Sequence, residues 1–221
     1  MKSPNFQPRP AGAVIDMLVI HYTGMQSAQA ALDRLCDPAS EVSAHYLIDE
    51  AGQVTALVDE ENRAWHAGVS NWRGRPDVNS RSIGIELVNP GHEFGYRPFP
   101  AAQMAALADL AQGILSRWPI PARNVVGHSD VAPRRKQDPG ELFDWYWLAQ
   151  RGIGLWPKRT GALPKSSLVG EAAALLAEYG YDIADPKAAL VAFQRHFRPL
   201  SCDGDADAET LALLNGAVAL L

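Results

Sequence analysis

The sequence has few cysteines, no excess of basic residues and no long apolar run. Its 221 residues include two cysteines, Cys36 and Cys202, which is too few for a disulfide framework or a cysteine-based zinc site. The formal net charge is −5. That charge argues against nucleic-acid binding, which usually needs a basic face, and it gives no support for binding to an anionic membrane. No stretch reaches the roughly 18–20 apolar residues of a membrane span.

The first 24 residues contain no apolar segment of signal-peptide length before the first predicted strand. We therefore expect a cytoplasmic protein as the chain stands, and a periplasmic or outer-membrane-associated one if the sequence has been trimmed. Hydrophobic residues make up 47% and charged residues 20% of the chain, which is typical of a globular protein. The sequence gives no indication of the oligomeric state.

Short apolar runs alternate with helical patterns over the first two thirds of the chain, which is typical of an α/β layer architecture. Strands are predicted at 17–21, 81–90 and 124–128, a hairpin at 44–61, and helices at 26–37 and 100–118. In the 81–90 strand, alternation places Ile83, Ile85 and Leu87 on one face and Gly84, Glu86 and Val88 on the other. The proline-rich residues 1–12 are expected to form an irregular arm.

The composition changes after residue 152, where Pro157, Gly161 and Pro164 punctuate the chain. We expect a linker at 158–166, which divides a catalytic domain, 1–157, from a helical domain, 167–221. Three apolar stripes at helical spacing, beginning at Leu168, Leu190 and Leu211, predict three short helices in the second domain. A domain of about 55 residues is near the lower limit of independent stability.

Two other patterns lack residues that their chemistry requires. Ser129 follows a histidine but is not part of a G-x-S-x-G elbow. The alternating aspartates of 203–210 resemble a calcium loop, yet Ala208 and Leu214 stand where an EF-hand needs glycine and glutamate. We instead expect Asp207 to be the N-cap of a helix.

Three residues form a candidate metal site. His21 and His128 each end a predicted strand, and Asp138 follows in a loop. Ligands bind at strand ends in α/β sheets, and two histidines with one carboxylate are a common catalytic zinc set. Pro133 and Pro139 restrict the loop that returns the chain to Asp138. The spacing alone is a weak signal, because the chain has six histidines and no H-E-x-x-H helix.

Two further residues have both an ordinary and a catalytic interpretation. Glu86 lies in a strand, on the face opposite the apolar side chains. It is either an outward-facing polar residue or a general base for the attacking water. Lys136 precedes Asp138 by two residues. It is either a solvated lysine beside Arg134 and Arg135 or a cation that stabilises a developing oxyanion. The pattern alone leaves both alternatives open.

Five stretches between residues 18 and 140 carry a family resemblance. They read VIHYTG, SAHYLID, AWHAGVSNWRG, NSRSIGIELVNPG and VVGHSDVAPRRKQDPG. In this order they resemble the zinc-dependent N-acetylmuramoyl-L-alanine amidases of the amidase type 2 family, which is related to phage lysozyme-type amidases and peptidoglycan recognition proteins. The resemblance implies an α/β fold with a central mixed β-sheet flanked by helices, and Zn²⁺ as the cofactor.

The resemblance also implies site residues. The zinc ligands match His21, His128 and Asp138, and the catalytic pair matches Glu86 and Lys136. Ala44 stands where the phage branch has a tyrosine, which favours the glutamate-based arrangement. Substrate contacts are expected from a set of polar and aromatic residues: Tyr22, Tyr46, His66, Trp72 and Asn79. The segments AFQRHFRP and DGDADAETLALL are similar to three-helix peptidoglycan-binding domains; the alternative is a plain helical appendage.

The function implied by the resemblance is hydrolysis of the amide bond between N-acetylmuramic acid, or its 1,6-anhydro form, and L-alanine of the stem peptide, in cell-wall degradation and recycling. Three alternatives stay open: a zinc peptidase that cuts within the stem peptide, a non-catalytic recognition module, and a structural wall-anchoring protein. The lack of a signal suggests small muropeptides as substrate, whereas the C-terminal domain suggests polymeric peptidoglycan.

Overall fold

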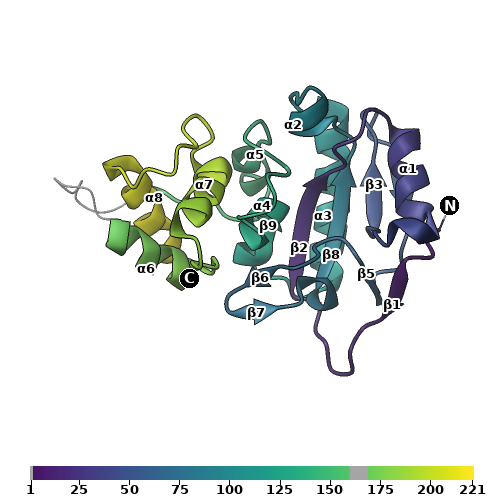
Figure 1. The fold of residues 1–221 in the computed structure, drawn as a ribbon, viewed down its shortest axis with the longest axis horizontal. Helices are drawn as coiled ribbons and strands as arrows, with labels where there is room; N and C mark the ends of the chain where they lie inside the picture. The colour runs from purple at the N-terminus through teal and green to yellow at the C-terminus, as the bar shows by residue number, and fades with distance from the viewer. Residues whose placement is uncertain (1, 160–168) are drawn as a thin grey trace.

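The computed structural model describes residues 2–159 and 169–221, and its centre is a five-stranded mixed sheet (Figure 1). The strands, in the order β4-β3-β8-β2-β9, are Val54–Ala56, Tyr46–Ile48, Ser82–Leu87, Met17–Tyr22 and Val125–Gly127. The hairpin partners β3 and β4 are antiparallel, and the neighbouring pairs from β3 to β9 are parallel. The predicted strands and hairpin are therefore confirmed, and the sheet is mixed as the resemblance implied.

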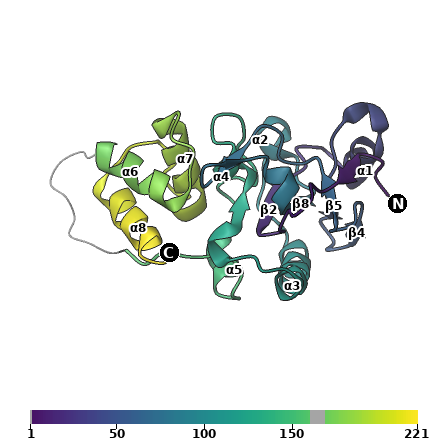
Figure 2. The same cartoon turned by 90° about the horizontal axis from the view of Figure 1, so that it is seen from below.

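One face of the sheet is covered by the helix α3, Ala101–Arg117. Leu18 and Ile20 of β2 and Ile83 and Ile85 of β8 pack there, against the apolar side of the helix. Because side chains alternate along a strand, His21 and Glu86, each one residue after an isoleucine of this face, project from the other face. The helix α1, Ala28–Cys36, lies on that second face, and Figure 2 shows α1 and α3 on opposite sides of the strands.

The second face is covered at its two ends and open between them. At the β3 end, Ala31 and Leu35 of α1 pack on Leu47. At the β9 end, Met17 and Val19 join a cluster that continues into the C-terminal helices. The polar side chains of β2 and β8 lie between these two apolar clusters, so the sheet floor of the site is bounded by packed walls.

Within residues 169–221 the chain forms three helices beside the β9 edge of the sheet (Figure 1). They are α6, Val169–Tyr179, α7, Pro186–Phe197, and α8, Ala208–Val218. Asp207 is the N-cap of α8, as expected, and accepts a hydrogen bond from Thr210 N at 2.9 Å. Residues 160–166 of the expected linker, and Leu168 of the first stripe, lie outside the described residues.

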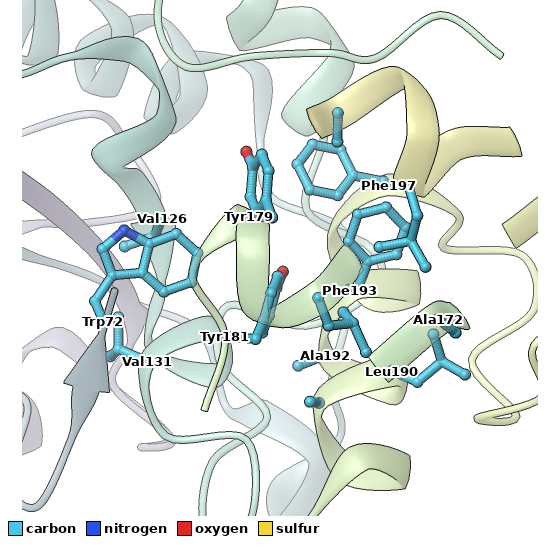
Figure 3. Close-up of a cluster of buried hydrophobic side chains, with 14 of the residues drawn as sticks. Trp72, Val126, Val131, Ala172, Tyr179, Tyr181, Leu190, Ala192, Phe193 and Phe197 are labelled. Carbon is cyan, nitrogen blue, oxygen red and sulfur yellow. The ribbon is translucent and has the colours of Figure 1, made fainter. Parts of the chain in front are cut away.

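The C-terminal helices share one hydrophobic cluster with the rest of the protein (Figure 3). The Trp72 ring lies in this cluster, with centroid distances of 5.9 Å to Tyr179 and 5.2 Å to Tyr181. Phe193 of α7 is fully buried in the same cluster. Removal of the helices would therefore expose a tryptophan that is fully buried in the whole chain.

The N-terminal arm is partly regular, which the sequence did not predict. Phe6–Pro8 form β1, which pairs antiparallel with β5, Asn62–Ala64. The side chain of Asn5 fixes the arm by donating to the carbonyl oxygens of Asp37 and Val42, both at 2.8 Å. Proline is tolerated here because the pair is an edge ladder of only two strands. The expectation of a wholly irregular arm was wrong because the partner strand is distant in sequence.

The remaining strands and α-helices of the described residues are short. They are β6, Asn71–Trp72; β7, Arg75–Pro76; α2, Gly91–Phe94; α4, His128–Val131; and α5, Trp145–Ala149. Two of them border the loop that contains Asp138: α4 begins at the residue after β9, and α5 follows the loop. None of the helices that the structure describes combines the length and the apolar character that crossing a membrane requires.

Candidate functional site

The carboxyl ends of three adjacent parallel strands bring the predicted residues together. In the parallel ladder of β2 and β8, His21 is paired with Glu86. On the other side of β2, Ile20 is paired with Gly127, and His128 follows at the start of α4. Two histidines and one carboxylate therefore lie at one edge of the sheet, which is where α/β proteins bind ligands.

The loop after α4 carries Asp138 back to the two histidines. Ser129 N donates to Asp138 O at 2.9 Å, and Lys136 N donates to Ala132 O at 3.1 Å, so backbone hydrogen bonds fold the loop. Asp138 Oδ2 lies 3.1 Å from both His21 Nδ1 and His128 Nδ1, and the two Nδ1 atoms are 2.9 Å apart. All three side chains are buried.

The hydrogen bonds behind His21 fix which of its ring nitrogens carries the proton. Ser82 Oγ donates to Val78 O at 2.7 Å, so it accepts from His66 Nε2 at 3.0 Å. His66 Nδ1 then accepts from His21 Nε2, also at 3.0 Å. A neutral imidazole has one N–H, so His21 Nδ1 presents a lone pair to the cluster.

The same reasoning applies to His128. Its Nε2 donates to Ala67 O at 3.0 Å, which leaves a lone pair on Nδ1. Two imidazole lone pairs and one carboxylate oxygen thus converge with no hydrogen between them. Such groups repel one another unless a cation lies among them, so this donor set fits a metal ion, held by histidines that are oriented from behind.

The local electrostatics keep His21 and Asp138 in the form that binds a metal. Burial, with a smaller effect of His128, lowers the pKa of His21 to about 4, so its imidazole is neutral at pH 7. Burial by itself raises the pKa of Asp138, but His128 and His21 outweigh it and hold that pKa well below its usual range. A neutral imidazole and an ionised carboxylate are the forms that bind metals.

Glu86 has the opposite electrostatic environment. Burial, and next the charge of Asp138, raise its pKa well above the usual range, although Lys136 opposes this. Within the described part of the chain, its buried Oε2 atom has no hydrogen-bond partner. A buried carboxyl of raised pKa in a cleft has the properties of a general base. This environment favours the catalytic interpretation of Glu86.

A cavity of about 360 Å³ lies over the cluster. Its floor is formed by Glu86, His128 and Asp138, and Lys136 reaches it from the loop. Its walls include Tyr22 and His66, together with Met25, Arg34, Leu35 and Trp65 on the α1 side. Two of the proposed ligands, His128 and Asp138, therefore share one solvent-connected space with the proposed base and cation, and it is large enough for part of a peptide.

The five expected substrate contacts do not all lie at this cavity. Tyr22 and His66 line it, and Tyr22 Oη is 2.8 Å from His92 Nδ1. The other three, Tyr46, Trp72 and Asn79, form hydrogen bonds within the protein. Tyr46 Oη donates to Glu60 Oε1 at 2.7 Å, and Trp72, fully buried, donates from Nε1 to Asn124 Oδ1 at 3.1 Å.

Asn79 is the third residue placed elsewhere. Its Oδ1 accepts from His66 N at 3.1 Å and from Ala67 N at 2.8 Å, so it orders the backbone that holds His66 and receives His128. We therefore assign Tyr46 and Trp72 to packing and Asn79 to backbone support. None of these three residues lines the cavity, so a contact with substrate stays a prediction that this geometry does not favour.

Three residues that the sequence reasoning did not single out support the site. Ser82 ends the hydrogen-bond chain behind His21. Gly84 leaves room for the His66 ring, because a Cβ at this position would lie 2.5 Å from the ring. Arg135 Nη2 donates to Ala67 O at 3.0 Å. Only Gly84 left a signal in the sequence, since a glycine inside a strand often marks a close approach.

We predict an acid-dependent loss of stability from His45. This buried residue accepts from Gly84 N through Nδ1 at 2.9 Å, and burial, opposed by Asn62 O, lowers its pKa from 6.5 to about 4. Between these pH values the unfolded chain binds a proton that the folded chain does not. The free energy of unfolding should therefore fall as pH falls, by up to about 1.4 kcal/mol per pH unit for this residue.

Urea unfolding of the metal-free protein from pH 7 to pH 4.5 measures this slope. The matched variant is His45→Asn, whose Oδ1 accepts from Gly84 N but does not titrate. It should have a slope smaller than the wild type by the contribution of about one proton. Equal slopes for the two proteins would contradict the prediction.

Comparisons with known proteins agree with this geometry. The family model described as N-acetylmuramoyl-L-alanine amidase matches residues 11–141. The chain is 41% identical over 233 residues to the N-acetylmuramoyl-L-alanine amidase AmiD of Escherichia coli (strain K12), covering 94% of this chain and 83% of that protein. It is 39% identical to the 1,6-anhydro-N-acetylmuramyl-L-alanine amidase AmpD of Haemophilus influenzae, covering 66% of this chain and 86% of that protein.

Among solved structures, the chain is similar to the complex of AmiD from E. coli with the substrate anhydro-N-acetylmuramic acid-L-Ala-D-gamma-Glu-L-Lys. The TM-score is 0.86 at 39% sequence identity. The match covers 97% of this chain and 93% of that chain, so it includes the C-terminal helices as well as the sheet.

Proposed function

Because the chain belongs to the N-acetylmuramoyl-L-alanine amidase family, we propose that His21, His128 and Asp138 bind one zinc ion in this protein. The chain is an enzyme that hydrolyses the amide bond between N-acetylmuramic acid, or its 1,6-anhydro form, and L-alanine of the stem peptide. The observation that carries the zinc proposal is the convergence of two Nδ1 lone pairs and Asp138 Oδ2 on one point.

The proposed mechanism gives each remaining residue one task. His21, His128 and Asp138 would hold the zinc, which would supply Lewis-acid polarisation of the scissile carbonyl and make the attacking water more acidic. Glu86 accepts a proton from the attacking water and then delivers it to the leaving amine of L-alanine. Lys136, which lines the same cavity, stabilises the negative charge that develops on the carbonyl oxygen. His66 keeps His21 oriented and stays neutral, because burial lowers its pKa.

The bond that is cut can be identified from the products. An amidase acting on a muropeptide releases a peptide with a free L-alanine amino group and an intact sugar that carries a lactyl carboxylate. A peptidase acting within the stem peptide would instead leave L-alanine attached to the sugar. Mass spectrometry of the products separates the two outcomes, and retention of L-alanine on the sugar would refute the proposed reaction.

The substrate form is a second part of the proposal. The AmpD relative is named for the 1,6-anhydro sugar, and the AmiD complex contains an anhydro-muropeptide. We propose that this chain accepts small anhydro-muropeptides and also polymeric peptidoglycan. Comparing rates on purified sacculi and on a soluble anhydro-muropeptide tests this, and activity on only one of them would restrict the proposal to that one.

We also propose that the C-terminal helices help to bind polymeric peptidoglycan. An aromatic pocket between α5 and α7 includes Tyr146 and Trp156, and Leu200 at its rim is fully exposed. Aromatic side chains with one polar end suit partly wet binding surfaces. We predict that Leu200→Glu lowers retention on insoluble sacculi and leaves turnover of a soluble muropeptide unchanged. Equal retention of the variant and the wild type would contradict a role for this pocket.

We predict that Ser82→Ala weakens metal binding without removing it. The substitution deletes the acceptor of His66 Nε2, so His66 no longer holds His21 in one tautomer and orientation. Loss of such a supporting group typically lowers metal affinity about 10–100-fold. Competition with a chelator of known zinc affinity measures the change.

Ser43→Ala is the matched control for Ser82→Ala. Ser43 is also a buried serine that both donates, to Asn5 O at 2.6 Å, and accepts, from Trp65 N at 2.8 Å. It lies outside the hydrogen-bond chain of His21. The Ser43→Ala control should lose stability but keep its zinc affinity. Equal zinc affinities of the two variants would show that the hydrogen bonds behind His21 do not affect metal binding.

A further inference from the structure

A buried carboxylate next to the metal ligands joins the C-terminal helices to the site. Asp130 lies two residues after His128 in α4 and is 1% exposed. Its Oδ2 accepts from Gly127 N at 2.7 Å and from His196 Nδ1 at 2.8 Å, and its Oδ1 accepts from Tyr181 Oη at 2.7 Å. Two of these three donors belong to the C-terminal helical unit.

The two C-terminal donors are themselves held firmly. The His196 ring stacks between Trp145 and Phe197, at centroid distances of 3.9 Å and 4.0 Å and interplanar angles of 16° and 19°. Tyr181 is buried against Trp72, and burial together with the charge of Asp130 raises its phenol pKa, so the hydroxyl keeps its proton and donates. A buried carboxylate needs such donors, because an unpaired one is costly.

Asp130 also organises the backbone turn that carries the metal ligands. By accepting from Gly127 N, it closes the turn between β9 and α4 around His128. Two residues after Gly127 in this turn, Ser129 N donates to Asp138 O. This turn therefore positions the ring of His128 and fixes the backbone of Asp138. The turn itself is fixed by the carboxylate of Asp130, which Tyr181 and His196 hold in place.

We propose that Asp130 is a positioning residue for the metal site, and that two C-terminal residues complete it: Tyr181, which follows α6, and His196 of α7. The C-terminal unit thus has a second role beside any wall binding: it sets the geometry of two metal ligands. The proposal rests on the proposed zinc site. It predicts that removing one hydroxyl in the C-terminal unit changes zinc affinity and turnover in the sheet domain.

The experiment compares Tyr181→Phe with Tyr179→Phe in the full chain. Both tyrosines are buried in the same cluster and contact the Trp72 ring, but only Tyr181 donates to Asp130 in the described structure. Tyr181→Phe should lower zinc affinity about tenfold, at the low end of the range for supporting groups, and lower kcat with little change in KM. Tyr179→Phe should have the zinc affinity, kcat and KM of the wild type.

A second pair of variants keeps the test valid if Tyr181→Phe folds poorly. In His196→Asn the amide nitrogen lies two bonds beyond Cβ, as Nδ1 does in histidine, and it can donate to Asp130. His196→Leu has a similar size and no donor. Zinc affinity and kcat should be higher in His196→Asn than in His196→Leu.

The outcomes separate this inference from the proposed function. Equal zinc affinity and kcat for Tyr181→Phe and Tyr179→Phe, with no difference between the two His196 variants, would overturn the positioning role. A wild-type protein that binds zinc but cleaves no muropeptide would refute the proposed reaction. In that case the zinc affinities of the four variants would still decide the role of Asp130.

Discussion

Replacing Glu86 with alanine is expected to leave zinc bound and to lower kcat about 10²–10⁴-fold, the usual effect of losing a general acid–base group. This corresponds to about 3–5 kcal/mol of activation free energy. Glu86 lies beside the proposed ligand His21 in the strand ladder but is outside the proposed ligand cluster. KM should change little, because the lost proton transfer belongs to the transition state.

Two controls make the Glu86 result interpretable. Zinc per chain, measured by elemental analysis, should equal the wild-type value. The free energy of unfolding should be equal to or above that of the wild type, because the substitution removes a buried carboxylate oxygen that has no partner among the described residues. Loss of a general base should lower kcat far more than about threefold. A variant with kcat within about threefold of the wild type would therefore contradict a base role for Glu86.

Replacing His128 with alanine should abolish both zinc binding and activity. The variant loses one of two imidazole donors and leaves His21 Nδ1 and Asp138 Oδ2 as an incomplete set. A catalytic zinc site ordinarily has three protein ligands. The wild type should therefore bind one zinc per chain, and His128→Ala should bind only a small fraction of one. Elemental analysis after gel filtration measures this, together with turnover of a muropeptide.

His92→Ala is the control for the His128 prediction. His92 is half-exposed and outside the ligand cluster, although it contacts Tyr22 at the cavity wall. It should keep one zinc per chain, whatever its effect on KM. If His128→Ala also kept one zinc per chain, the assignment of the three ligands would be wrong.

Local pattern predicted the elements that carry the site but not their neighbours. Strand alternation placed Glu86 opposite Ile83 and Ile85, and the structure has them so. The pairing of β2 with β8 brings His21 to Glu86, and this contact is between segments far apart in sequence. The spacing in the sequence did not predict that His21 and Glu86 lie together. Only the family resemblance predicted that they belong to one site.

Residues whose side chains have both apolar and polar parts were the hardest to assign. Trp72 and Tyr46 have the chemistry of substrate contacts, but each uses its polar atom within the fold. The C-terminal helices cover Trp72, and a single sequence does not reveal such packing between distant segments. The role of Asp130 was missed for the same reason, since two of its three donors come from beyond residue 180.

The parallel ladder of β2 and β8 also determines which changes in chain length the enzyme should tolerate. His21 and Glu86 are paired in it, so their separation depends on backbone hydrogen bonds between strands and not on any loop. A one-residue deletion between 82 and 86 would move the carboxylate to the α3 side of the sheet. Insertions in 24–27 or 89–99, which lie outside the strands, would leave the pair unchanged. Engineering of substrate range can therefore vary the length of these segments while the spacing of the proposed ligand His21 and the proposed base Glu86 stays constant.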